Sequence, residues 1–229
     1  MILRHLLRLL MVILILAAYA PPLRSQERVL DPVDEAAKDA SWGSFKKSLL
    51  AALEKRDRDF VLSILDPDVR SGLDSARGVD AFKQEWVLES DSGPLWKELA
   101  AVLALPAAYH RPEKGPLELC VPYVAVRWPQ DMDAYRGGAI IVRSAAVKSA
   151  PSSGAGTIAT LSYHMVEVTD WEVSDRAADS KQKWVKVRVR AGEGYVPEEQ
   201  IRSPIEHTAC FIKSERDWRL VGFGPGGGK

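Results

Sequence analysis

The chain has 229 residues with 31 basic and 31 acidic side chains, so it carries no net charge. A neutral chain has no general attraction for nucleic acid or for an anionic membrane surface, and nucleic acid is therefore not expected as a partner. The 46% hydrophobic content is ordinary for a globular protein, and the length suffices for one large domain or two small ones.

The first segment, residues 1–25, has the layout of a secretory signal peptide. Arg4 and Arg8 give it a positive start, and its apolar run is shorter than the about 20 residues of a transmembrane helix. Cleavage is expected after Ala20 or near Ser25, and removal of the first 25 residues would leave 28 basic against 31 acidic side chains, a net charge of −3. An uncleaved N-terminal anchor is the alternative. We expect a periplasmic or secreted protein that contacts a membrane only if this segment stays attached.

Residues 26–40 are polar and acidic, and we expect a linker. Residues 41–105 then contain four runs with apolar residues at helical spacing, the first beginning at the candidate N-cap Ser41. The second run ends before Pro67, because proline disfavours helix for the residue that precedes it. The sequence therefore predicts a small α-helical unit over residues 41–105.

Residues 106–138 contain five prolines, which exclude a regular helix across most of the segment. We expect an irregular connecting segment that lies against the following domain and could contain one extended strand over residues 120–129.

Short strand-like stretches fill residues 139–204. In residues 183–190 three valines alternate with aromatic or charged residues, a pattern typical of a half-buried antiparallel strand. Glycines in residues 192–194 then allow a reversal into a return strand. We expect a last hairpin over residues 205–223 and a disordered tail over residues 224–229.

Three elements of this region resemble a bacterial Src-homology-3-like (SH3b) domain. They are the loop Val147-Lys148-Ser149-Ala150-Pro151, the strand Trp184-Val185-Lys186-Val187 and the return Gly192-Glu193-Gly194-Tyr195-Val196. The loop departs from the family's usual Val-Arg-Ser-Gly-Pro, which puts any function of that loop in doubt. The resemblance covers residues 139–204, under a third of the chain. It implies a small β-barrel, and residues 205–223 resemble the strand pair that larger uncharacterised bacterial proteins append to such a domain.

Members of this family are often cell-wall or peptide-binding modules, so the resemblance also implies an aromatic-lined groove. In this chain the groove residues would be Tyr163, Trp171, Trp184 and Tyr195. The alternative is that these side chains pack against the helical unit or against residues 106–138.

Cys120 and Cys210 are the only cysteines. In an oxidising compartment such a pair is a disulfide candidate, and closing a loop of about 90 residues would stabilise the fold by roughly 4–5 kcal/mol. Two unpaired buried thiols are the alternative.

The sequence has no group of residues at the spacing of a catalytic or metal-binding motif. After the first segment the histidines are His110, His164 and His207, and none belongs to a metal-spaced pair. We therefore expect no metal, cofactor or catalytic residue, and the pattern favours a binding protein over an enzyme. The prediction is an α+β protein with an α-helical N-terminal unit, an SH3-like barrel and an appended C-terminal hairpin. It would be a non-catalytic binding or scaffolding module at the bacterial cell envelope, with peptidoglycan or an envelope protein as its partner.

A second interpretation starts from residues 45–82, which faintly resemble the opening of the nuclear-transport-factor-2-like class. That class includes small isomerases and dehydratases, so this resemblance implies a small-molecule binding protein or an isomerase-like enzyme. The long curved strands that the class has next are replaced here by the proline-rich segment.

Overall fold

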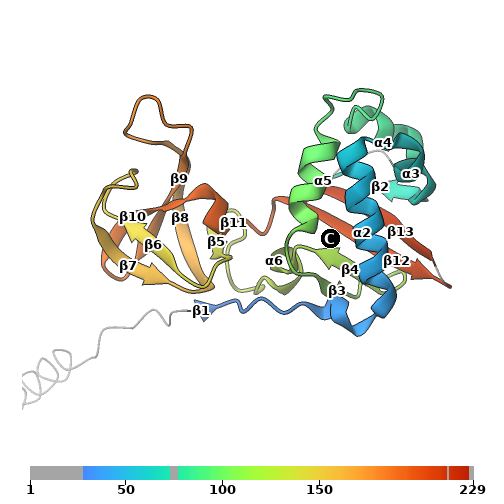
Figure 1. The fold of residues 1–229 in the computed structure, drawn as a ribbon. Coiled ribbons are helices and arrows are strands. Elements are labelled where there is room, and N and C mark those ends of the chain that lie inside the picture. The colour runs from blue at the N-terminus through green and yellow to red at the C-terminus, as the bar shows by residue number, and fades with distance from the viewer. Residues whose placement is uncertain (1–27, 73–76, 216, 227–229) are drawn as a thin grey trace, which may run out of the picture.

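The computed structural model describes residues 28–72, 77–215 and 217–226. The expected signal peptide and the last three residues of the expected tail lie outside the described residues. The fold is α+β, as predicted, and Figure 1 shows two lobes side by side. One lobe is built on an eight-stranded sheet, here sheet A, and the other on a five-stranded sheet, sheet B, with helices against it.

The sheet B lobe contains the four helices predicted in residues 41–105, which are α2 (Ala40–Lys55), α3 (Arg58–Ser63), α4 (Val79–Glu85) and α5 (Leu95–Leu103). It also contains the 3-10 helix η1 (Glu35–Lys38), within the stretch expected to be a linker. Its strands, in their order across the sheet, are β2 (Leu65–Arg70), β13 (Asp217–Pro225), β12 (His207–Ser214), β4 (Glu118–Val121) and β3 (Ala108–His110). All neighbours pair antiparallel except β2 and β13, which pair parallel.

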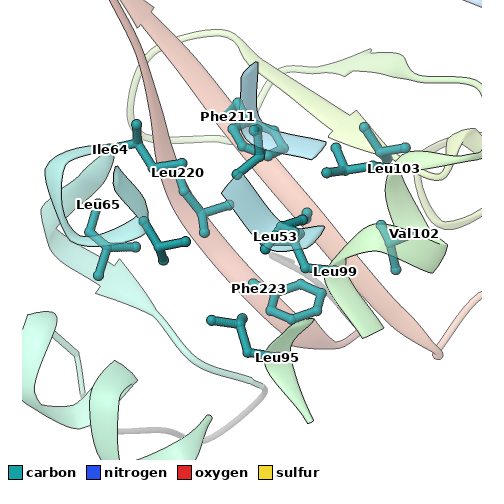
Figure 2. Packing of buried hydrophobic residues seen from close by; sticks show 14 of the residues in the cluster. Leu53, Ile64, Leu65, Leu95, Leu99, Val102, Leu103, Phe211, Leu220 and Phe223 are labelled. Carbon is teal, nitrogen blue, oxygen red and sulfur yellow. The ribbon is translucent and has the colours of Figure 1, made fainter. Parts of the chain in front are cut away.

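Helix α2 begins two residues earlier than its sequence signal suggested. The Asp39 carboxylate, rather than Ser41, caps the helix by accepting the Ser41 amide, and Arg56 ends it in the left-handed region. The apolar face of the helix then lies on sheet B. Figure 2 shows Leu53 of α2 and Leu99 of α5 meeting Phe211 and Phe223 of the sheet. Burying each such side chain stabilises the fold by about 1.5–3 kcal/mol.

The C-terminal hairpin belongs to sheet B, which corrects the expectation that it is appended to the SH3-like region. Strand β12 pairs with β4, and β13 pairs with β2, so the hairpin supplies interior strands of the sheet under the helices. The physical reason is the alternation of Ala209 and Phe211, whose apolar side chains the helices cover. Strand β13 also extends to Pro225, so the predicted disordered tail begins inside a strand.

Residues 106–138 are not an irregular connector. They hold β3, β4 and the short helix α6 (Tyr123–Arg127), and β5 starts at their end. The five prolines lie just outside these elements, where a missing amide costs no ladder hydrogen bond.

The sheet A lobe is continuous in sequence apart from a short N-terminal strand. Its elements are β5 (Gly137–Ile140), β6 (Ala145–Lys148), β7 (Thr157–Leu161), β8 (His164–Ser174), β9 (Lys183–Val189), β10 (Gly192–Pro197), η2 (Glu198–Gln200) and β11 (Ile201–Arg202). The strand order is β11-β5-β8-β9-β10-β6-β7, and β1 (Arg28–Val29) pairs with β8. The two ends of this order, β7 and β11, do not pair within the described residues, so a closed barrel is not shown. Residues 137–148 hold two strands, β5 and β6.

Sheet A surrounds a small core of its own. The core residues are Ile140, Ala145, Val147, Leu161, Val166, Val168, Val185, Val187, Val196 and Ile201. They come from strands at both ends of the order, including β11 and β7, so the sheet must curl to bring them together.

A third cluster joins the lobes. Leu30, which follows β1, packs with Tyr123 and Trp128 and with Ala139 of β5. The Leu30 amide donates to the Tyr163 carbonyl at 2.8 Å, and the Tyr123 hydroxyl donates to the Leu30 carbonyl at 3.1 Å. The N-terminal segment is thus a strap that contacts both lobes. Among the described residues, no helix has the length and apolar character to cross a membrane.

Candidate functional site

The outer face of β9 and β10 carries two of the four aromatic residues predicted to line a groove. Val185, Val187 and Val196 face the core. Alternation along each strand therefore turns Trp184 and Tyr195 to the opposite face. Pro197 is the register partner of Trp184, and Tyr195 lies opposite Lys186 on one side and Lys148 on the other.

Trp184 is covered by the protein's own chain. It is only 2% exposed, although it lies on the outer face. Its indole Nε1 donates to Asp175 Oδ2 at 2.8 Å, in the loop that follows β8. That loop also reaches the loop after β6, because the Arg176 amide donates to the Pro151 carbonyl at 2.9 Å. Trp184 is thus an anchor beneath two joined loops rather than an exposed contact surface.

Asp175 organises this arrangement. Its carboxylate accepts the Ala177 amide at 2.8 Å as well as the Trp184 indole. The Ala177 amide, the Trp184 indole and the Ser180 side chain hold the pKa of Asp175 below its usual value, because they stabilise the carboxylate. Residues 175–181 have the composition of a charged loop. Spacing does not single out Asp175, because it lies nine positions before Trp184 and outside the strand.

Tyr195 is the accessible aromatic side chain of this face. It is half-buried and lies between two lysines. Lys186 Nζ contacts Glu193 at 2.6 Å, while Lys148 Nζ donates to the Ala155 carbonyl and to Thr157 Oγ1. A ligand that meets Tyr195 would therefore also meet ammonium and carboxylate groups.

Along the same face the charges alternate. Arg188 contacts Glu167 at 2.8 Å, and Arg136 contacts the same carboxylate at 2.6 Å. Exposed ion pairs of this kind contribute about 0–1 kcal/mol, so they shape the polarity of the face more than its stability.

The other two predicted groove residues lie elsewhere. Trp171 packs against the sheet A core and lies within the register shift of β8 against β9 between Asp170 and Val173. Tyr163 has a left-handed backbone at φ 55° and lies at the junction, where its carbonyl binds the strap. Burial, with a smaller contribution from Tyr163, raises the pKa of Tyr123 to about 12. The structure thus brings together Trp184 and Tyr195 but neither Trp171 nor Tyr163.

Cys120 and Cys210 form a disulfide, as one of the two interpretations predicted. They are register partners in β4 and β12, on the face of sheet B turned away from the helices. The Glu118 carboxylate lies beside them and accepts both terminal nitrogens of Arg70. These acidic and sulfur groups do not make a metal centre, because the two sulfurs are bonded to each other.

The space between sheet B and its helices is filled. Among the described residues, the cluster there consists of apolar and aromatic side chains. A histidine–carboxylate pair that sequence reasoning missed lies at the edge of this lobe, where His207 Nδ1 is 3.4 Å from Glu98 Oε2. The pair is half-exposed, and its members lie too far apart in the sequence for spacing to reveal them.

No protein-family model, curated protein or solved structure matches this chain.

Proposed function

We propose that this protein is a non-catalytic binding module of the bacterial cell envelope and that its sheet A lobe is SH3-like. Three features support the lobe assignment. The sheet curls around one core, the 3-10 helix η2 precedes the last strand, and the resembling motifs form neighbouring strands β9 and β10. The periplasmic or secreted location rests on the residue pattern of the first segment.

The observation that carries the binding role is the face around Tyr195. A half-buried aromatic ring lies beside two lysines and next to two joined loops, which anchor the neighbouring Trp184. An extended peptide can lie across such a face, with an apolar group on the ring and its carboxylate or carbonyl groups on the lysines. The stem peptides of peptidoglycan have this chemistry, so we propose the cell wall as the partner.

Retention on purified peptidoglycan tests this function. We expect the wild-type protein to be retained and Tyr195→Ala to lose at least about tenfold in affinity, equivalent to about 1.4 kcal/mol. Tyr135→Ala is the matched control, because Tyr135 is 73% exposed and lies in the loop before β5. Trp184→Ala is a poor probe, since removing a buried indole would damage the fold.

Two results would contradict the proposal. One is a wild-type protein that is not retained. The other is equal retention of wild type and Tyr195→Ala when both have the same melting temperature.

The second candidate is a small-molecule binding protein or isomerase-like enzyme of the nuclear-transport-factor-2-like class. Sheet B supports this candidate, because the class has strands after its opening helices. Residues 106–138 were not expected to supply them, but the C-terminal hairpin supplies strands of this sheet. Ligands of that class would lie between the sheet and the helices. Apolar side chains fill that space here, so this candidate has less support than the binding module.

A further inference from the structure

A groove on the sheet B lobe lies outside both the helix-covered core and the Tyr195 face. It runs between α2, α3 and the start of β13, with a cavity volume of about 540 Å³. Ligand pockets usually measure about 300–1,000 Å³, so the groove can hold one or two small rings. Phe45 and Phe60 give it an aromatic floor, and Ser44, Ser48, Asp217 and Arg219 line it with polar groups.

The aromatic floor is held rigidly. Phe45 stacks on Trp218 with ring centroids 6.3 Å apart and also contacts Trp42 and Phe211. The Trp218 indole donates to Ser41 Oγ at 3.0 Å. A ring fixed on its inner side can offer its remaining side to a ligand at little entropic cost.

Three polar side chains of the groove are not used by the fold, whereas the Ser63 hydroxyl donates to the Phe60 carbonyl at 2.7 Å. Among the described residues, no hydrogen bond or ion pair occupies the Ser44 hydroxyl, the Ser48 hydroxyl or the Asp217 carboxylate, and all three side chains are exposed. Arg219 uses one terminal nitrogen for a long contact of 3.4 Å to the Leu65 carbonyl. Ser41, by contrast, is fully engaged, since its hydroxyl also donates to Asp39. Two hydroxyls, a carboxylate and most of a guanidinium are therefore available above the rings.

This combination selects a class of ligand. A pyranose ring has one apolar face, suited to a phenyl ring, and a rim of hydroxyls that both donate and accept. The carboxylate and serines would accept or donate to that rim, and the guanidinium would donate to it. A zwitterionic amino acid would satisfy Asp217 and Arg219 but would leave both serines and most of the aromatic floor without a partner.

We infer that this groove is a carbohydrate-binding site. It does not depend on the Tyr195 face, because it lies in the other lobe and shares no residue with that face. The trisaccharide of N-acetylglucosamine carries no stem peptide, so the groove assignment can fail without the Tyr195 assignment, whereas whole peptidoglycan would offer ligand groups to both sites.

Titration of the full chain with the trisaccharide of N-acetylglucosamine tests the inference, with tryptophan fluorescence and calorimetry as readouts. We expect saturable binding with a dissociation constant of about 0.1–10 mM. Ser48→Leu, which fills the groove, and Asp217→Asn, which removes a charge-assisted acceptor, should each weaken binding at least about tenfold. Glu54→Gln is the matched control, since Glu54 is an exposed carboxylate on α2 that does not line the groove. Tyr195→Ala should bind the sugar as the wild type does.

Three outcomes would overturn the inference. The first is the absence of saturable binding by the wild type. The second is unchanged affinity in Asp217→Asn, which has no partner in the fold and serves as the deciding variant if Ser48→Leu lowers the melting temperature. The third is binding of the dipeptide Ala-Ala without binding of the trisaccharide, which would assign the groove to zwitterions.

Discussion

The two lobes differ in how the chain builds them. The sheet A lobe is one nearly continuous stretch, residues 137–202, around a small aliphatic core. The sheet B lobe is assembled from the two flanking stretches, and its core includes most of the buried aromatic rings. Trp42, for example, contacts both Phe211 and Trp218, with its ring centroid 5.0 Å from each of theirs.

The two lobes therefore use their aromatic residues differently, the sheet B lobe for stability and the sheet A lobe for the proposed binding face. Aromatic rings in the sheet B core contact one another, and their burial contributes to the free energy of folding. In the sheet A lobe the main aromatic pair lies on the outer face, where Trp184 supports two loops and Tyr195 stays accessible. We therefore expect the sheet B lobe to resist unfolding more strongly, with the strap and the disulfide controlling how far the two lobes unfold together.

Removing the disulfide should have the largest effect. Cys120 and Cys210 are 90 residues apart, and all of the sheet A lobe except β1 lies between them. Closing a loop of that length stabilises a protein by about 4–5 kcal/mol in the chain-entropy description. The double variant Cys120→Ala/Cys210→Ala should lose about this much if both lobes unfold together, and less if the sheet A lobe stays folded and shortens the flexible part of the loop. Amide exchange, read separately in β9 and β12, measures the effect in each lobe.

We expect β12 to lose more protection than β9, because the bond lies in sheet B. Equal losses in both strands would show that the lobes are a single unfolding unit and would remove the distinction drawn above. Wild-type protein under reducing conditions is the control for the two substitutions.

The helices of residues 41–105 and most strands were predictable because each has a local signal. Apolar spacing in residues 41–105 and the alternation in residues 183–190 reflect burial of one face of an element by its neighbours. The placement of the C-terminal hairpin was not predictable in this way. Its partners β4 and β2 lie far upstream, and no local pattern states which sheet a strand joins.

The same limit applies to the candidate site, where local features follow from the sequence and features that join distant segments do not. Tyr195 alternates with the core residue Val196 and so lies on the outer face, a placement that depends on neighbouring residues only. The burial of Trp184 depends on a loop-to-loop hydrogen bond, and Asp175 caps it from a different segment. The groove beside α2 needs residues from α3 and β13, which the sequence separates by about 150 positions.

The second prediction concerns Glu35, in the 3-10 helix η1 that follows the strap. Glu35 accepts from Lys38 at 2.7 Å and from the Tyr109 amide at 2.8 Å, and it also binds Arg127. Glu35→Gln should lower the free energy of unfolding by about 1.5–3 kcal/mol, the range for hydrogen bonds to a charged group. Urea unfolding followed by tryptophan fluorescence measures this loss. Glu89→Gln, at an exposed carboxylate after α4, should have no such effect.

The same carboxylate makes this contribution depend on pH. The Lys38 ammonium first, then the Tyr109 amide and Arg127, lower the pKa of Glu35 from 4.5 to about 2. A lowered pKa in the folded state means that the stabilisation is complete above pH 4.5 and is lost as the pH falls toward 2. The difference between wild type and Glu35→Gln should therefore shrink over that interval. A difference that stays constant from neutral pH to pH 2 would contradict the assigned role.

The smallest expected effect concerns the loops over Trp184. Asp175→Ala removes the acceptor of both the Trp184 indole and the Ala177 amide, which should loosen the loop locally. Because the loops lie at the edge of the sheet A lobe, the sheet B lobe should keep its stability. The Trp184 indole proton should exchange with solvent faster by at least about tenfold, as measured by NMR. Asp175→Asn is the matched control, since its side-chain oxygen can still accept one of the two bonds and should give an intermediate rate. An indole proton that stays protected in Asp175→Ala would mean that packing alone covers Trp184, and the two joined loops would then not be the support on which the Tyr195 face depends.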